Sequence, residues 1–185
     1  MNRLTSEDDV VKTLINCHHM QDGFVVAAPE EHYNHYGDRG VVDLFVEHSV
    51  FDGHRQWVYE VKSEAAVREV TGANEILRQF NRMKKYFFKR TDHEPGSQVF
   101  YNLTFVPTEY TLQHIKENYS IYEQSMGFEE NATGKIRDAK ISIAHSDMGI
   151  GGIEIRSDTL RTASSQLMHV NPDLAAELSS VFNEV

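Results

Sequence analysis

Short apolar segments alternate along the chain with longer segments in which apolar residues recur every three or four positions. The apolar segments of strand length are residues 24–28, 40–46, 57–64, 98–106, 139–144 and 149–155. Helical spacing is found at residues 6–20, 74–90 and 108–126. The order of helix, three strands, helix, strand, helix and strands predicts an α/β fold with a mixed central sheet and helices on both faces.

Polar segments predict how these elements are connected. The turn at residues 51–54 lies between two predicted strands, which are therefore expected to form a hairpin. Residues 30–39 follow a proline, are rich in His, Tyr and Asn, and are predicted to form a loop. Residues 127–134 are predicted to form another loop. We expect one domain over residues 1–156 and a C-terminal helical tail, residues 157–185, packed on it.

Charged residues interrupt two of the apolar strands. Glu60 and Lys62 are two positions apart, so on a strand both side chains point to the same face. Asp43 is the lone acid of the preceding apolar strand. Such groups are costly to bury without partners, and two carboxylates on neighbouring strands favour a site for a hard cation. Lys62 beside them suggests chemistry on a phosphate. The alternative is a buried Glu60–Lys62 ion pair beside an isolated acid.

This pattern resembles the PD-(D/E)XK nuclease superfamily. The match consists of Asp43, sixteen intervening residues, and Glu60-Val61-Lys62, each half on a predicted strand. Val42 stands where the proline that gives the motif its name would be. The resemblance covers roughly residues 6–156, and its N-terminal part looks most like small archaeal Holliday-junction-resolvase-like nucleases. It implies a restriction-endonuclease-like core.

The residue types indicate the chemistry of the predicted site. Asp43 and Glu60 supply oxygen ligands for Mg²⁺, with Mn²⁺ as a possible substitute, and the resemblance implies the Val61 backbone carbonyl as a further ligand. Lys62 could orient the attacking water or stabilise charge on the phosphate. In resolvase-like members an acid on the first helix completes the metal site. Glu7 is the candidate here, and Glu31 is the alternative.

The helix over residues 74–90 has two contrasting faces. Its apolar face is formed by Ile76, Phe80, Met83 and Phe87. Its basic face is formed by Arg78, Arg82, Lys85 and Lys89, with Gln79 and Tyr86 at the border. The basic face is a candidate contact for nucleic-acid phosphates, and the alternative is an ordinary solvated helix face. Gln79 resembles a helix glutamine of exonuclease-like members, but Met83 stands where those members carry a tyrosine.

Tyrosine and histidine are two further residue types with the chemistry to bind a ligand. Tyr33 and Tyr36, in the predicted loop before Asp43, could stack on nucleic-acid bases. The chain has 10 histidines and one cysteine, but their spacing fits no common zinc pattern. We therefore predict the histidines to be surface or core residues.

Composition limits the functional classes. The formal net charge of −10 argues against a protein that coats nucleic acid through bulk charge, although a local basic surface remains compatible with it. A single cysteine, a polar N-terminus and the lack of a membrane-length apolar run favour an intracellular, cytoplasmic protein.

These observations predict an enzyme, a Mg²⁺-dependent DNA endonuclease that hydrolyses phosphodiester bonds. The alternative is a non-catalytic module with the same fold that binds nucleic acid or protein. A homodimer is expected by analogy with the superfamily only.

Overall fold

The computed structural model describes residues 4–21, 23–50, 53–69, 72–90, 97–132, 134–144, 153–155 and 176. Four helices are found in these ranges: α1 (Glu7–His19), α2 (Glu64–Glu69), α3 (Ala73–Arg90) and α4 (Glu109–Glu123). The strands are β1 (Phe24–His35), β2 (Asp38–Val50), β3 (Gly53–Lys62), β4 (Gln98–Phe105), β5 (Gly127–Glu130), β6 (Ile136–Ile143) and β7 (Ile153–Glu154).

These strands form one mixed sheet in the order β1-β2-β3-β4-β6-β5, with β7 also paired to β6. The first three strands are antiparallel, so the predicted hairpin of β2 and β3 is confirmed. β3, β4 and β6 run parallel, while β5 and β7 pair with β6 in the antiparallel direction. The predicted α/β fold with a mixed sheet is therefore confirmed.

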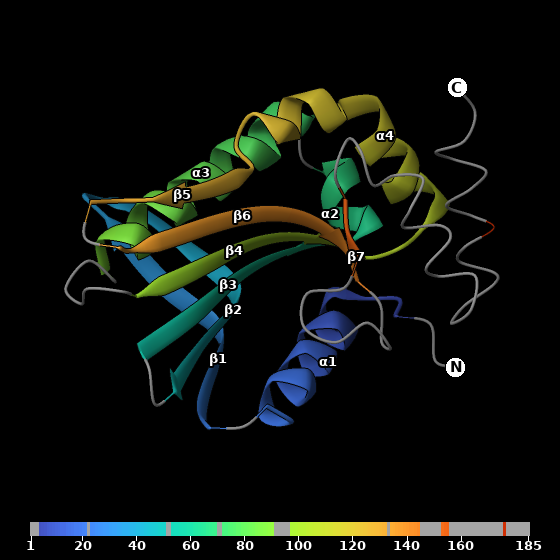
Figure 1. Cartoon of the computed structure of the whole chain (residues 1–185). Coiled ribbons are helices and arrows are strands. Elements are labelled where there is room, and N and C mark those ends of the chain that lie inside the picture. Colours follow the sequence, from blue (N-terminus) through green and yellow to red (C-terminus); the bar gives the residue numbers. More distant parts are fainter. Residues whose placement is uncertain are drawn as a thin grey trace.

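Helices cover both faces of the sheet, with α1 on one face and α2, α3 and α4 on the other (Figure 1). α1 begins at Ser6, whose hydroxyl accepts a hydrogen bond from the Asp9 N–H. Its apolar side places Val10 and Leu14 in one core cluster with side chains of β2 and β3. The opposite helices share a second and larger cluster with the other face of the sheet.

α3 provides the centre of the larger cluster. Ile76, Phe80, Met83 and Phe87 are at most 1% exposed, as the helical periodicity predicts. α4 begins with a capping box, in which the side chains of Thr108 and Thr111 bond to each other's backbone N–H. The buried apolar side chains of α4 belong to the same core cluster as those of α3.

The prediction of a loop over residues 30–39 is wrong, because these residues belong to a β-hairpin. β1 continues past Pro29 to His35, and the chain reverses through Tyr36 and Gly37, whose φ angles are 51° and 94°. Positive φ at both central residues is typical of a type I′ hairpin turn. Pro29 is tolerated because β1 is an edge strand, where a missing backbone donor costs little.

One smaller prediction also needs correction. Residues 127–134 were expected to form a loop, but the first four of them form β5 at the edge of the sheet. The polar segment after β3 contains the short helix α2. The final predicted strand is described only at β7, and the tail over residues 157–185, with its predicted helix, lies outside the described residues except for Ala176.

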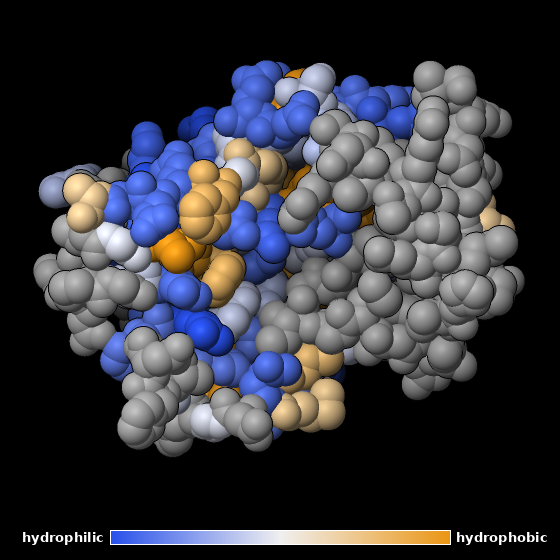
Figure 2. Space-filling model, in the orientation of Figure 1, coloured by the Kyte–Doolittle hydropathy of each residue, from blue (hydrophilic) through white to orange (hydrophobic). Residues whose placement is uncertain are grey.

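The described surface is mostly polar. Figure 2 shows hydrophilic residues over much of one face, with a small group of hydrophobic residues where β5 and β6 lie in Figure 1. Phe128 of β5 is 61% exposed. In the described part of the chain, no helix combines the length and apolar character needed to cross a membrane.

Candidate active site

Asp43 lies at an irregularity in the pairing of β1 and β2. The register passes from Pro29–Leu44 directly to Glu31–Val42, and the intervening Glu30 has a positive φ of 53°. On a regular strand, residues an odd number of positions apart face opposite sides of the sheet. Val42 and Phe45 nevertheless belong to the same core cluster, so the alternation shifts by one residue between them. Asp43 occupies this shift.

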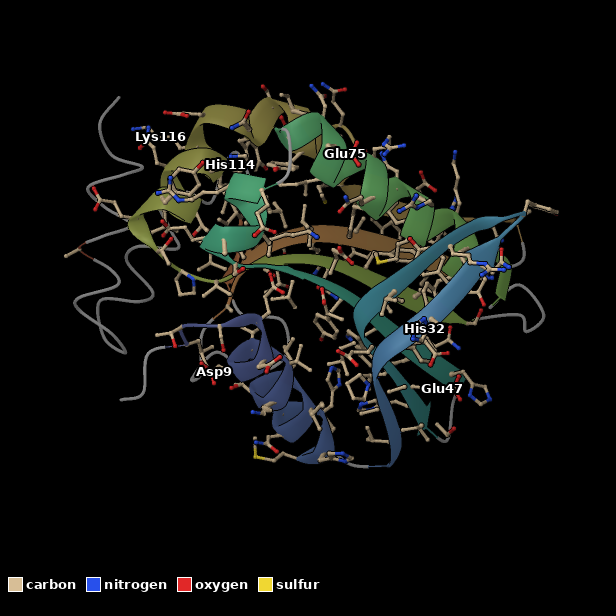
Figure 3. The ribbon with its side chains drawn as sticks, turned by 180° about the vertical axis from the view of Figure 1, so that it is seen from behind. Asp9, His32, Glu47, Glu75, His114 and Lys116 are labelled. Atoms are coloured by element: carbon tan, nitrogen blue, oxygen red, sulfur yellow. The ribbon has the colours of Figure 1, made fainter. Side chains whose placement is uncertain are left out.

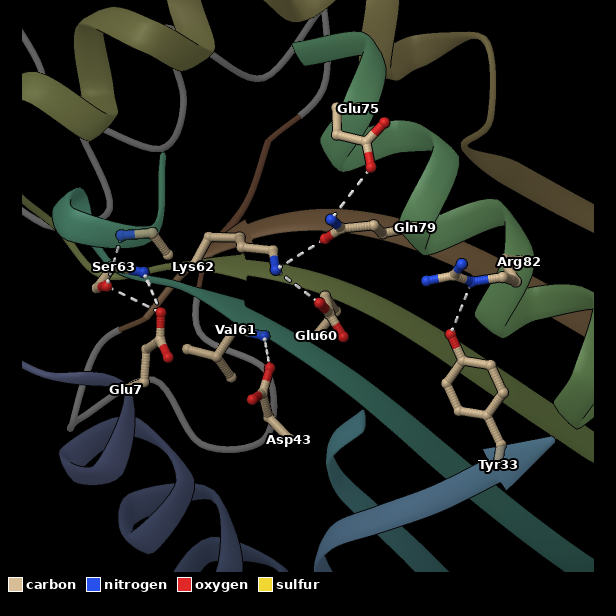
Figure 4. Close-up of polar contacts among 11 residues, drawn as sticks. Glu7, Tyr33, Asp43, Glu60, Val61, Lys62, Ser63, Glu75, Gln79 and Arg82 are labelled. Carbon is tan, nitrogen blue, oxygen red and sulfur yellow. Dashed lines mark hydrogen bonds and ion pairs between the residues drawn. The ribbon is translucent and has the colours of Figure 1, made fainter. Parts of the chain in front are cut away.

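The irregularity allows the Asp43 side chain to reach the backbone of the neighbouring strand. The regular β2–β3 ladder ends at Leu44–Tyr59. Just past this point, Oδ2 of Asp43 accepts a hydrogen bond of 2.6 Å from the Val61 N–H (Figure 4). The carboxylate is therefore fixed beside Glu60 and Lys62, the neighbours of Val61 on β3.

Glu60 and Lys62 form a buried ion pair. Lys62 Nζ lies 2.6 Å from Glu60 Oε1, and the two residues are only 8% and 9% exposed, respectively. Lys62 Nζ also donates a longer hydrogen bond, of 3.4 Å, to Oε1 of Gln79 on α3. The opposite face of the strand, represented by Val61, packs in the α1-side cluster. The alternation of β3 thus directs both charged side chains toward α3.

The charges of this cluster perturb one another. Burial, reinforced by the Glu60 carboxylate, raises the pKa of Asp43 to about 7. Burial is the largest single influence on the pKa of Lys62 and lowers it, but the carboxylates of Glu60, Asp43 and Glu7 together outweigh burial, so the pKa of the lysine is raised. Lys62 is therefore a cation at neutral pH, and two carboxylates compete for its charge. Such a cluster favours an additional cation.

Glu7 and Glu31 were the two candidates for a further acid at the metal site, and Glu7 is the one that lies near this cluster. Its charge acts on both Asp43 and Lys62. Its Oε1 accepts hydrogen bonds of 2.8 Å from both the backbone N–H and the hydroxyl of Ser63. Glu7 therefore connects the first turn of α1 to the end of β3. Glu31 lies on the hairpin instead, opposite Val42.

The basic face of α3 is more engaged than its sequence suggests. Arg78 is exposed but makes two hydrogen bonds of 2.7 Å to the carboxylate of Glu75, which also accepts from Gln79. Arg82 is half-buried, and its Nε donates to the Tyr33 hydroxyl at 3.3 Å. The remaining predicted contacts are Lys85, which is exposed; Tyr86, which is half-buried; and Lys89, whose side chain lies outside the described residues.

Sequence reasoning missed Glu75, Ser63 and the structural role of Tyr33. Glu75 precedes Arg78 by three positions and Gln79 by four, a spacing at which helical side chains meet, so this contact could have been recognised. The bond between Glu7 and Ser63 spans 56 residues and carries no local signal.

The donor set at this site is compatible with a hard divalent cation. In the described residues no hydrogen bond engages Oδ1 of Asp43 or Oε2 of Glu60, and carboxylate oxygens are the ligands that Mg²⁺ prefers. No group of three or more His, Cys, Asp or Glu side chains arranged to hold a metal occurs within these described ranges. A metal here would therefore need backbone or water oxygens in addition to the two carboxylates.

Comparison with known proteins gives a consistent result. A family model described as PD-(D/E)XK nuclease superfamily domain matches residues 5–146, which include every residue of the cluster. No curated protein and no solved structure matches the chain. The family match covers most of the 185 residues. The chain therefore belongs to the PD-(D/E)XK nuclease superfamily.

Proposed function

We propose that this protein is a Mg²⁺-dependent DNA endonuclease. Membership of the superfamily supports a nuclease-type function and a nucleic-acid substrate. The observation that carries the finer proposal is the convergence of Asp43, Glu60 and Lys62 beside the end of β3 (Figure 4). Folding alone gives little reason for a half-buried aspartate beside a buried glutamate and a buried lysine, because buried ion pairs are often neutral for stability.

Asp43 and Glu60 would hold the cation through the oxygens that their hydrogen bonds leave unengaged, with the Val61 carbonyl as a further donor. When bound, the cation polarises the scissile phosphate and lowers the pKa of the attacking water. The Val61 N–H holds Asp43 in place, and the bond from Ser63 leaves the second oxygen of Glu7 for a bridging water.

Lys62 is proposed to stabilise the negative charge that develops on the phosphate during hydrolysis. Its ammonium is charged and is directed by two acceptors, Glu60 on its own strand and Gln79 on α3. Gln79 is in turn held by Glu75 at 3.3 Å, so the helix fixes the direction of the lysine. The proposed DNA contacts are Arg78, Gln79, Arg82, Lys85 and Tyr86, with Lys89 included from the sequence alone.

A closed circular DNA tests this proposal, because an endonuclease nicks a circle and an exonuclease cannot enter it. The parent protein should nick the circle in Mg²⁺ and not in EDTA. Asp43→Asn and Lys62→Ala should each lower the nicking rate by at least about 10²-fold, in line with the loss of an electrostatic catalytic group.

Glu47→Gln is the matched control for Asp43→Asn. Glu47 lies on the same strand and bonds to Gln56 on β3 at 2.8 Å, away from the cluster. This variant should nick at the parent rate. A parent protein that binds DNA but never cuts it would instead be the non-catalytic module, and equal nicking by all variants would refute the assignment of the site.

A further inference from the structure

The outer half of the β1–β2 hairpin, residues 31–42, extends beyond the rest of the sheet, and we call it the arm. The β2–β3 ladder runs only from Leu44–Tyr59 to Val50–Gly53, so the arm begins where Asp43 leaves that ladder. Figure 3 shows the hairpin, on which His32 is labelled, curving away from the sheet toward α3, on which Glu75 is labelled. The arm and α3 therefore flank the candidate active site.

The arm is held firmly against α3. Tyr33 is only 5% exposed and packs against Tyr86 and Phe87, with ring centroids 5.2 and 6.1 Å away. Its hydroxyl accepts the hydrogen bond from Arg82. The opposite strand of the arm carries Gly40, where a Cβ atom would lie 2.3 Å from the Tyr33 ring. The glycine thus allows the tyrosine to lie flat across the arm, and this packing fixes the direction of the arm.

The other face of the arm is exposed. It consists of two cross-strand pairs, His32 with Val41 and Asn34 with Arg39. All four residues are exposed, and Tyr36 at the tip is 88% exposed. In the turn, the Asn34 side chain accepts a hydrogen bond from the Gly37 N–H at 3.0 Å, which stabilises the tip. Neither pair contains an acid, and in a chain with a net charge of −10 an exposed surface of this composition is suited to an anionic partner.

We propose that the arm binds an unpaired nucleotide of the substrate, with Tyr36 stacking on its base. This inference rests on the proposed nuclease function and narrows its substrate to branched or partly single-stranded DNA. A tyrosine can stack only on an exposed base face, and in a continuous duplex neighbouring bases cover those faces. The polar residues of the arm's outer face can bond to base edges, and Arg39 can contact a phosphate.

The length of the arm sets the distance between the stacked base and the cut. Tyr36 precedes Asp43 by seven residues, and a strand rises about 3.3 Å per residue, so the two positions are separated by at most about 23 Å. Consecutive nucleotides of one DNA strand are about 3.4 Å apart along the duplex. The unpaired base is therefore expected within about seven nucleotides of the scissile phosphate.

Binding to three DNAs of matched sequence tests the inference: a continuous duplex, the same duplex with a single-stranded flap, and the single strand. Affinities are measured in Ca²⁺, and 2-aminopurine placed in the flap reports stacking by its fluorescence. The parent should prefer the flap substrate, and Tyr36→Ala should weaken that binding by about 5- to 150-fold, which corresponds to the loss of one base–aromatic stack. Tyr36→Phe, which keeps the ring, should retain the affinity and the quenching of 2-aminopurine.

Phe128→Ala is the matched control, since it removes an exposed aromatic ring from β5, at the far edge of the sheet. It should bind all three DNAs as the parent does. Equal affinity of the parent for flap and duplex, or an equal loss for every DNA in Tyr36→Ala, would overturn the role of the arm and leave the nuclease proposal intact if circles are still nicked. A Tyr36-dependent flap preference without metal-dependent cutting would support the arm and overturn catalysis. A parent that binds none of the three DNAs would overturn both.

Discussion

Replacing Asp43 with Asn should stabilise the metal-free protein while removing its proposed activity. The pKa of Asp43 is raised from 3.8 to about 7, with burial as the main cause, so the folded state binds the proton more tightly than the unfolded state does. Between these two values, rising pH therefore lowers the free energy of unfolding of the parent protein. Asn carries no titrating charge, and its carbonyl oxygen can still accept the hydrogen bond from the Val61 N–H.

The size of the effect follows from the shift. One pKa unit corresponds to about 1.36 kcal/mol. Relative to a neutral side chain, a shift from 3.8 to about 7 therefore lowers the free energy of unfolding by at most about 4 kcal/mol at pH 8 and about 2 kcal/mol at pH 5. Asp43 is only half-buried, and water screens part of this penalty. We expect Asp43→Asn to be more stable than the parent by about 1–3 kcal/mol at pH 8, and by about half as much at pH 5.

Urea unfolding in EDTA at both pH values measures the two free energies. Comparing variant and parent at each pH cancels the titration of groups that do not interact with Asp43. Glu47→Gln is again the control and should show no such pH-dependent gain. Added Mg²⁺ should stabilise the parent protein by mass action and leave Asp43→Asn unchanged. A variant no more stable than the parent at pH 8, or a gain independent of pH, would refute this account of the carboxylate.

Two further predictions concern the packing of the arm and a buried histidine. Gly40→Ala should lower the free energy of unfolding by about 1–3 kcal/mol, the usual cost of overpacking, because the added Cβ would meet the Tyr33 ring. Urea unfolding measures this loss, with Val41→Ala as the control at an exposed site. Equal stability of the two variants would contradict the fixed packing of the arm. His18 is fully buried, its Nε2 lies 2.8 Å from the Tyr59 hydroxyl, and burial lowers its pKa from 6.5 to about 3. The stability that the neutral imidazole of His18 contributes is therefore present above pH 6.5 and is lost as the pH falls toward 3, with a loss of about 2 kcal/mol at pH 5. In urea titrations, His18→Gln should flatten this dependence of the unfolding free energy on pH. An unchanged slope between pH 7 and pH 5 would rule this out.

Features encoded by short-range periodicity could be predicted from the sequence. The spacing of Ile76, Phe80 and Met83 identified the buried face of α3, and a polar residue at Thr108 marked the start of a helix. The two-residue spacing of Glu60 and Lys62 predicted that their side chains share a face of the strand, and in the structure the two side chains are hydrogen-bonded to each other. These predictions needed only the repeat of a helix or a strand.

Features that depend on distant contacts could not be predicted in this way. Pro29 is a strong local signal for the end of a strand, but its position at the sheet edge, which removes the penalty, is set by the whole topology. Tyr33 and Tyr36 look alike in the sequence. Only the packing of the hairpin on α3 buries the first and exposes the second. The contact between Glu7 and Ser63 likewise arises when α1 packs beside the end of β3.

Lys62 provides the site with a resident counter-ion. Its ammonium lies 2.6 Å from Glu60, so the buried glutamate is compensated before any metal is bound. Classical zinc fingers, by contrast, are unfolded without their metal. For the proposed metal-dependent nuclease, a chelator should remove the cation and leave a folded protein, which can be loaded again. If the proposed metal dependence holds, folding does not require the metal, and a cell could store the protein folded and inactive until the cation is available.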